Sequence, residues 1–525
     1  MVGDGSDVGR EVSIKFSENG IIVGAGAFKR IMDCGLPVDE IISKAKESKI
    51  WFLDEQFLEE YVIVTKEDKK ACKDLEAKAR DQEARDLAQQ EGREPPPAVD
   101  VSRPTKDIPA KGMESRLVIN EKSDVTGKST CSGSIDDFVD YFNARYAATK
   151  GVLQERMEYK SVMTIADVIK AGSSMGNSKV RIICMVSEKR TSDKNYKFLD
   201  VEDPTGELTV FISDKNPLLS QTFERVLMDE VIGVEGTLRN KLFIASEITQ
   251  PDIPLNKPPK YADENVYAAF ISDIHVGSYL FLEREFQKFI DWISGSGNKR
   301  EIADSLKYIF VAGDLVDGVG IYPTQESELT IPDVYKQYDF LSMLLEQIPS
   351  HIEIVLSMGN HDAVRNAEPQ PRLSKDMGGK LFELPNVHVV GNPIWLSAHD
   401  VDILMYHGTS LDMIISNLSG CSYSRPETAM IEYLKRRNLI PMYGVEGIAP
   451  EKKDYLFIKD VPDIFHCGHV HTNGYTNYHG VHVLNSGTWQ SKTKYQEQLG
   501  HTPTPARVPV INLRNHDINM LYFGE

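Results

Sequence analysis

Five short polar motifs occur in order through the second half of this 525-residue chain, and each follows a hydrophobic, strand-like run. The motifs are Asp273-Ile-His275, Gly313-Asp314, Gly359-Asn360-His361-Asp362, His407-Gly408 and Gly468-His469-Val-His471. The runs before them are 266–271, 308–312, 352–356, 403–406 and 464–465. Because α/β folds place their chemistry on loops that leave strand ends, the pattern predicts one site built from five loops.

The donor atoms in these motifs are imidazole nitrogens and carboxylate or amide oxygens. Such a mixed set suits Mn, Fe, Zn or Ni, whereas an all-oxygen cage would suit Mg or Ca. All 13 histidines lie at or after His275, so metal chemistry is confined to the second half of the chain. Together the motifs supply ligands for two metal ions. The remaining histidines are interpreted as structural: His351, His388, His399, His466, His479, His482, His501 and His516.

Length and cysteine usage narrow the class of protein. A chain of 525 residues exceeds what one core serves, so two to four domains are expected. Its six cysteines form no C-x-x-C pair, which argues against a disulfide framework and a structural zinc site. The N-terminus lacks a basic and apolar leader, and no run approaches the roughly 18 apolar residues that a membrane helix needs. These features predict a cytoplasmic protein without a membrane partner.

The formal net charge of −19 argues against tight, autonomous DNA binding. Non-specific DNA affinity normally comes from Lys and Arg that neutralise phosphates. Bound divalent cations offset acidic charge locally, and a basic partner subunit could supply the remaining attraction. We therefore expect weak DNA affinity for the chain alone.

The first 160 residues divide by composition into three parts. Residues 1–65 carry amphipathic stretches, which predict a small helical domain for protein contacts, although a simple terminal extension is equally compatible. Residues 66–134 predict a charged flexible linker, because 16 of the 28 residues from Lys66 to Arg93 are charged and a Pro-Pro-Pro run follows. Residues 135–160 predict a connecting helix.

Residues 161–255 predict a barrel of the OB-fold type. A helix over 217–228 separates three expected strands from two more, which is the OB-fold order. The expected strands are 180–186, 196–201, 207–212, 231–237 and 242–246. Tyr196 and Phe198 share one strand face and could stack on single-stranded nucleic acid, but a structural role is favoured. Residues 256–525 alternate strands with helices, which predicts a layered α/β domain.

The five motifs resemble those of the calcineurin-like metallophosphoesterase superfamily over residues 260–525. Its protein phosphatases usually continue the Gly-Asp motif with Asp-Arg-Gly, but here Gly313-Asp-Leu-Val-Asp317 runs directly into Gly318. The missing Arg would be a phosphate clamp, so its absence disfavours a phosphatase. The whole chain resembles most the small, exonuclease subunits of archaeal D-family DNA polymerases. The segments carrying that resemblance are Arg156-Met-Glu, Asn485-Ser-Gly-Thr-Trp489-Gln490 and Pro503-Thr-Pro-Ala-Arg-Val-Pro509.

The resemblance implies a multidomain fold: a calcineurin-like α/β domain preceded by an all-β OB-fold domain and a small helical N-terminal domain. It also assigns the ligands. One ion is expected on Asp273, His275, Asp314 and His471. The other is expected on Asp314, Asn360, His407 and His469, so that Asp314 bridges the pair. His361 is expected to be the general acid, with a role in orienting Asn360 as the alternative.

The implied activity is 3′-5′ exonuclease proofreading at single-stranded or mismatched DNA ends. The ions are expected to be Mn²⁺, with Fe²⁺ or Mg²⁺ as alternatives. The implied partners are a large subunit, which would hold the polymerase site and use this chain as a scaffold, and possible contact with the sliding clamp. Two other hypotheses remain: a catalytically silent structural subunit, disfavoured by the intact ligand set, and a phosphoesterase acting on other substrates.

Overall fold

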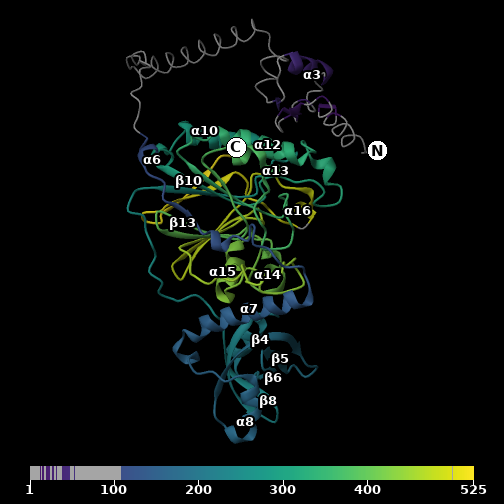
Figure 1. Cartoon of the computed structure of the whole chain (residues 1–525), viewed down its shortest axis with the longest axis vertical. Coiled ribbons are helices and arrows are strands. Elements are labelled where there is room, and N and C mark those ends of the chain that lie inside the picture. The colour runs from purple at the N-terminus through teal and green to yellow at the C-terminus, as the bar shows by residue number, and fades with distance from the viewer. Residues whose placement is uncertain are drawn as a thin grey trace, which may run out of the picture.

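The computed structural model describes residues 108–498 and 500–524, together with 12, 15–16, 19, 21–23, 27–28, 31, 38–47 and 52–53 of the N-terminal part. Residues 66–107 of the expected linker lie outside the described residues. A barrel occupies one end of the long molecule, helix α7 (Ile135–Gln154) crosses the middle, and a layered domain follows (Figure 1). None of the described helices is both long and apolar enough to span a membrane.

Two six-stranded sheets form the centre of the layered domain. The first sheet is ordered β12 (Val387–Val389), β11 (Glu353–Ser357), β10 (Leu306–Ala312), β9 (Tyr267–Ile271), β18 (Arg507–Asn512) and β19 (Ile518–Tyr522). The second is ordered β16 (Asn473–Tyr478), β17 (Val481–Ser486), β15 (Ile464–Cys467), β14 (Val401–Met405), β13 (Ile394–Ala398) and β3 (Leu117–Ile119). Strands β9 to β12 are parallel, as are β14, β15 and β17, so their carboxyl ends share an edge in each sheet.

Helices cover the outer face of each sheet and make four layers (Figure 1). Alternate residues of β9 show the arrangement: Ala269 and Ile271 pack towards α10 (Glu283–Ser294) and α12 (Val334–Glu346), while Phe270 packs between the sheets. Helices α14 (Leu411–Asn417) and α15 (Pro426–Arg436) cover the second sheet. Strands buried on both faces read as continuous hydrophobic runs, which is what the sequence shows before each motif. Shorter helices are α6 (Pro109–Gly112), α11 (Arg300–Ala303), α13 (Lys375–Gly378) and α16 (Lys494–Gln498).

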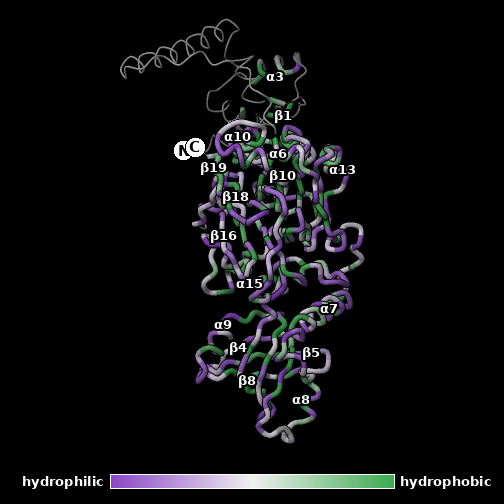
Figure 2. The backbone as a smooth tube through the Cα atoms, turned by 90° about the vertical axis from the view of Figure 1, so that its left-hand side faces the viewer, coloured by the Kyte–Doolittle hydropathy of each residue, from purple (hydrophilic) through white to green (hydrophobic). Residues whose placement is uncertain are grey.

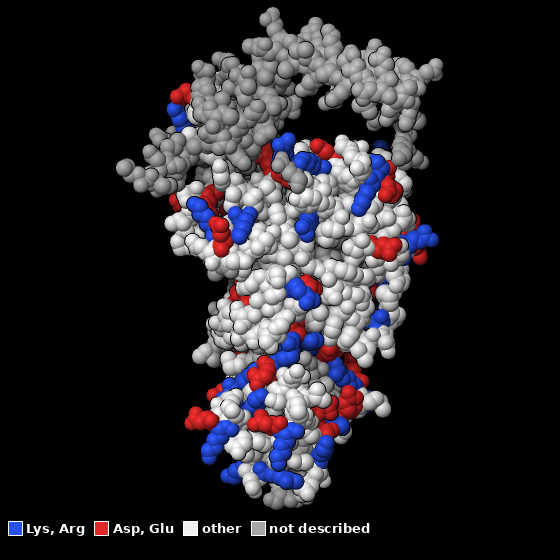
Figure 3. All heavy atoms as spheres, turned by 180° about the vertical axis from the view of Figure 1, so that it is seen from behind, with Lys and Arg blue, Asp and Glu red and all other residues white. Residues whose placement is uncertain are grey.

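The smaller domain is a closed five-stranded barrel with a hydrophobic core of its own (Figure 2). Its order is β4 (Val180–Thr191), β5 (Lys197–Asp203), β6 (Gly206–Ile212), β8 (Leu242–Thr249) and β7 (Val231–Arg239). Helix α9 (Pro217–Arg225) lies between β6 and β7, the third and fourth barrel strands in chain order, as predicted, and α8 (Ile165–Ala171) precedes the barrel. Acidic and basic side chains are intermingled on the barrel face seen in Figure 3.

The aromatic residues of the barrel pack against one another. Phe198 lies directly opposite Phe211 on the neighbouring strand, with ring centroids 5.6 Å apart, and both rings are half-buried. The ring centroid of Tyr196 lies 6.0 Å from that of Phe211. Cross-strand aromatic pairs stabilise sheets, so the packing of Phe198 on Phe211 favours a structural role for Phe198, while Tyr196 stays 48% exposed.

Helix α7 joins the barrel to the layered domain. It begins with a capping box between Ser134 and Asp137. From its buried face Arg145 forms a 3.2 Å ion pair with Asp454 of the layered domain, and both side chains are almost fully buried. On the barrel side the Tyr146 hydroxyl donates to the carbonyl of Ile183 at 3.0 Å. Contacts on both sides fix the barrel relative to the layered domain.

Residues 108–134 differ from the flexible linker that composition predicts. Strand β3 pairs antiparallel with β13 and forms the edge of the second sheet. Further along, the amide of Gly391 donates to Asp124 at 3.0 Å, and Ser129 donates to Glu451. The prediction was wrong here because β3 has only three residues, one of them exposed, and its polar neighbours pack through hydrogen bonds that a hydrophobicity pattern does not register.

The described part of residues 1–65 contains both helix and strand. Helix α3 (Val38–Glu47) accompanies two short parallel strands, β1 (Ile22–Val23) and β2 (Phe52–Leu53). Their hydrophobic residues form a separate buried cluster that includes Phe16. The ring of Phe28 meets Tyr279 of the layered domain edge-on, with centroids 6.1 Å apart. The expectation of a purely helical unit therefore omits a strand pair, and the domain boundaries stay a prediction.

Candidate metal centre

All the site residues predicted from sequence gather where parallel strands of the two sheets end. Loops after β9, β10 and β11 of the first sheet carry Asp273, His275, Asp314, Asn360 and His361. Loops after β14 and β15 of the second sheet carry His407, His469 and His471. The site thus spans the junction between the sheets.

One group of donors surrounds Asp273. The Nε2 atom of His471 lies 3.4 Å from Asp273 Oδ1. The same nitrogen lies 3.0 Å from Nε2 of His275, which is itself 3.8 Å from Asp314 Oδ2. Asp273, His275 and His471 are all buried, and they offer ligand atoms within 4.8 Å of one another.

A second group shares the same oxygen of Asp314. Nε2 of His407 lies 3.3 Å from Asp314 Oδ2 and 3.0 Å from Oδ1 of Asn360. Nδ1 of His469 approaches the same Asn360 oxygen at 3.1 Å. Asp314 therefore stands between the two groups, at the position expected of a bridging ligand.

The hydrogen bonding of His407 shows that this arrangement fits a cation. Its Nδ1 lies 2.8 Å from the carbonyl of Ala312, and because a carbonyl only accepts, Nδ1 carries the proton. Nε2 of the neutral ring is then an acceptor that faces the oxygens of Asn360 and Asp314. Three acceptors directed at one point repel one another unless positive charge lies between them, and either a second proton on His407 or a divalent metal ion supplies that charge.

The pKa values of His407 and Asp273 also indicate that the centre favours positive charge. Burial opposes protonation of His407, but Asp314 outweighs it and raises the pKa of this imidazole to about 10. Burial likewise opposes ionisation of Asp273, yet the hydrogen bond and charge of His471 hold its pKa below the ordinary value. Metal binding displaces protons from such groups, so mixed nitrogen and oxygen donors of this kind suit transition-metal ions.

The backbone at the centre adopts conformations that non-glycine residues rarely take. Five of the predicted ligands have positive φ: Asp273 (52°), His275 (53°), Asp314 (50°), His469 (69°) and His471 (56°). Such residues cost on the order of 1 kcal/mol or more each and concentrate at functional sites. The surrounding fold holds these side chains towards one another at the expense of stability.

Two glycines leave room for the carboxylates of Asp314 and Asp273. A Cβ atom on Gly359 would lie 2.2 Å from Asp314 Oδ1, and one on Gly468 would lie 2.4 Å from Asp273 Oδ2. Both distances are far below van der Waals contact. The glycines of the third and fifth motifs are therefore required because the carboxylates occupy the space of a side chain.

Two carboxylates that the sequence analysis did not assign orient the imidazoles. Asp317 accepts from Nδ1 of His275 at 3.1 Å, and Asp412 lies 3.2 Å from Nε2 of His469. Amides of Gln325 and Gln490 also donate to Asp317, each at 3.0 Å. A carboxylate behind a ligand histidine fixes its ring and tautomer. Asp317 follows the Gly-Asp motif closely enough to have been a candidate, whereas no pattern marks Asp412.

His361 lies beside both groups. Its Nδ1 lies 2.8 Å from the Asp317 carbonyl, which therefore accepts a proton from it and leaves Nε2 as the ring's other polar atom. Its ring meets that of His275 edge-on, with centroids 4.7 Å apart. Asp362, the next residue, accepts from the amide of Gly359 at 2.8 Å and so supports the loop.

Comparison with known proteins agrees with this geometry. Residues 267–508 match the family model of the calcineurin-like phosphoesterases. The DNA polymerase II small subunit of Methanocaldococcus jannaschii is 43% identical over 410 residues, which are 77% of this chain and 68% of that protein. The DNA polymerase II small subunit of Archaeoglobus fulgidus is 40% identical over 434 residues, 82% of this chain and 86% of that one. A solved archaeal phosphodiesterase aligns over 49% of this chain and 99% of its own, at 12% identity and a TM-score of 0.25, which is too low to support any conclusion.

Proposed function

Because this chain belongs to the family of DNA polymerase II small subunits and contains a calcineurin-like phosphoesterase domain, we propose that it is a two-metal 3′-5′ DNA exonuclease that proofreads for a large polymerase subunit. The observation that carries the proposal is the pair of donor groups that share Asp314 Oδ2. A catalytically silent subunit would have no need of so complete and strained a donor set. The silent alternative is therefore disfavoured.

In this proposal the ligands divide as the family resemblance implies. Asp273, His275 and His471 would hold one ion, Asn360, His407 and His469 the other, and Asp314 both. Bound divalent ions supply a nucleophile at neutral pH and offset the charge of the phosphodiester. We assign Mn²⁺ as the preferred metal because four of the seven ligands are imidazoles.

The chain's own residues would orient the substrate and move one proton. The Asp317 carbonyl holds His361 through Nδ1, so that Nε2 is the atom available for proton transfer. From there it would donate to the departing 3′ oxygen, as a general acid. Asp317 and Asp412 would keep the ligand imidazoles aligned throughout turnover.

Outside the centre, we assign the closed barrel as an OB fold and propose that barrel and layered domain together form the scaffold for the large subunit. The support is helix α7, which fixes the two domains to each other through Arg145 and Tyr146. DNA is the proposed substrate. A contact with the sliding clamp and a cytoplasmic location stay predictions.

The test is a nuclease assay on the purified chain, alone and with the large subunit. Single-stranded and mismatched duplex DNA, labelled at the 5′ end, should be shortened one nucleotide at a time from the 3′ end. Activity should vanish with chelator and return with Mn²⁺ better than with Mg²⁺. Shortening from the 5′ end would refute the proposed polarity, and equal rescue by Ca²⁺ would refute the assignment of the metal.

A further inference from the structure

Tyr322 lies at the rim of the metal centre, on the loop that leaves the Gly-Asp motif. Its side chain is 37% exposed. Its ring meets the ring of His361 at an interplanar angle of 62°, with centroids 6.5 Å apart. A partly exposed aromatic side chain thus stands next to the residue that we assign as proton donor.

The loop that presents Tyr322 is held firmly at its base. Gln325, 1% exposed, donates to the carbonyl of Asp317 at 2.7 Å and accepts from the amide of Ile321 at 2.9 Å. Gln337 of helix α12 bonds both the amide and the carbonyl of Gly318, at 2.9 and 3.1 Å. Buried amides therefore hold the base of the loop.

The tip nevertheless exposes three apolar side chains close together. Val319, Ile321 and Tyr322 are 40%, 37% and 37% exposed. On the other side of Glu328 lies Tyr279, 41% exposed, whose amide donates to the Glu328 carbonyl at 2.8 Å. Contiguous exposed apolar surface beside a polar centre is a mark of a binding site.

We propose that Tyr322 is the platform on which an unpaired terminal base stacks while its phosphodiester occupies the metal centre. The inference rests on the proposed nuclease function and identifies how that site selects its substrate. A base is joined to its phosphate through one sugar. The ring centroids of Tyr322 and His361 are only 6.5 Å apart, so a base on Tyr322 and its phosphate at the metal centre are within reach of one nucleotide. Every base has a π-face, so stacking binds any sequence.

Charge around the loop makes stacking the main source of affinity there. The Tyr322 hydroxyl donates to the carboxylate of Glu328 at 3.1 Å, and Glu326 lies on the same loop. With a net charge of −19, the chain offers DNA little long-range attraction. A base within a duplex is already stacked and paired, so it cannot reach the ring. Selection of single-stranded and frayed ends follows.

The test compares Tyr322→Ala with Tyr322→Phe on two single strands that differ only at the 3′ end, one with a normal nucleotide and one with an abasic nucleotide. Tyr322→Ala should raise KM for the normal strand by about 10-fold, since stacking on one aromatic ring is worth on that order. On the abasic strand it should match the unaltered protein. Tyr322→Phe keeps the ring and should stay within about twofold of the unaltered protein on both strands.

A matched control is Tyr522→Ala, which removes an exposed tyrosine from edge strand β19. It should change neither strand's KM. Two results would overturn the stacking role: an equal rise of KM on normal and abasic strands in Tyr322→Ala, or a rise of KM in Tyr322→Phe as large as in Tyr322→Ala. Either result would make Tyr322 a support of the loop through Glu328.

Binding separates this inference from the proposed nuclease. Fluorescence anisotropy of the two labelled strands, recorded with Ca²⁺, measures stacking without cleavage. If the unaltered protein binds the normal strand more tightly than the abasic one and loses that preference in Tyr322→Ala, the platform stands even where no DNA is cut. If no preference exists, the platform is refuted whatever the nuclease assay gives.

Discussion

At the scale of single residues, Asp314 is the side chain on which most of the centre depends. Its Oδ2 faces both donor groups, and its Oδ1 accepts from the amide of His361 at 2.9 Å. One carboxylate thus positions the proposed ligands and the proposed acid together. His361, in contrast, is held by the Asp317 carbonyl and contributes its ring from the side.

Asp314→Ala should abolish nuclease turnover and metal binding together, because neither donor group is then complete. His361→Ala should lower the turnover rate by at least about 100-fold, the usual contribution of a general acid, and should keep both ions. Elemental analysis of the two purified variants beside their activities decides the matter. Equal metal loss in both would make His361 a ligand or a structural residue.

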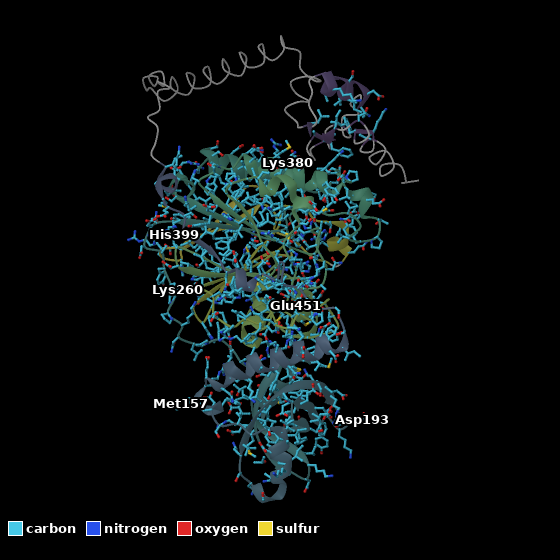
Figure 4. All side chains as sticks on the ribbon, viewed as in Figure 1. Met157, Asp193, Lys260, Lys380, His399 and Glu451 are labelled. Atoms are coloured by element: carbon cyan, nitrogen blue, oxygen red, sulfur yellow. The ribbon has the colours of Figure 1, made fainter. Side chains whose placement is uncertain are left out.

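Asp317→Asn should weaken Mn²⁺ binding by about 10- to 100-fold, since it removes the charge that orients and strengthens His275. Isothermal titration with Mn²⁺ measures the change. Asp193→Asn, an exposed position on the barrel labelled in Figure 4, is the control and should bind as the unaltered protein does. An unchanged affinity in Asp317→Asn would show that His275 is oriented without this carboxylate.

At the scale of elements, helix α15 is joined to the barrel by a buried group of charges. Glu432 of α15 forms ion pairs with Arg225 at the end of α9, at 2.5 Å, and with Lys435, at 2.9 Å. Arg436, one turn along α15, pairs with both Glu432 and Glu230 of the barrel. The interface between the domains therefore depends on ionised carboxylates.

Acid should weaken this interface. Burial opposes ionisation of Glu432, but Arg436 outweighs it and lowers its pKa to about 2. Because the folded pKa is below the unfolded one, the stabilisation is fully present above about pH 4.5 and is lost as pH falls towards 2. Its size is on the order of 3 kcal/mol. Urea denaturation gives the free energy of unfolding of the unaltered protein and of Glu432→Gln. The difference between the two should therefore become smaller from pH 7 to pH 3.5, and a constant difference would contradict the mechanism.

The elements also show what a sequence can and cannot predict. The barrel strands begin within a residue of their expected positions because alternating inward residues, such as Leu199 and Val201, mark them clearly. Strand β3 was missed because three residues carry no period. The proposed ligands could be picked out because each motif follows a buried strand. Asp412, in contrast, comes near His469 only through the fold, from helix α14, which carries no recognisable polar motif.

At the scale of the whole molecule, the continuously described part of the chain begins at residue 108, well before the connecting helix. Residues 108–134 belong to the layered domain through β3 and Asp124. The N-terminal residues touch that domain through Phe28 and Tyr279. Residues 108–134 are therefore part of the layered domain, whereas the described N-terminal residues contact it from outside.

Deleting residues 1–107 should leave metal content, nuclease activity and capture of the large subunit largely unchanged. Deleting residues 1–134 should lower the thermal stability, because strand β13 then loses its neighbour and becomes an open edge. Thermal unfolding and co-purification of both truncated chains test the difference. If the shorter deletion already loses the large subunit while it stays folded and metal-loaded, the partner surface lies within residues 1–107.

The junction between the two sheets has a mechanical consequence. Four of the seven proposed ligands are attached to one sheet and three to the other, so ions held between them would fasten two layers whose facing surfaces pack through side chains. Warming or strain that lets the layers slide would release the ions before either sheet comes apart. A variant lacking one ligand would accordingly have weaker packing between the two sheets as well as lower catalytic activity. Its loss of activity would therefore have a structural cause as well as a chemical one.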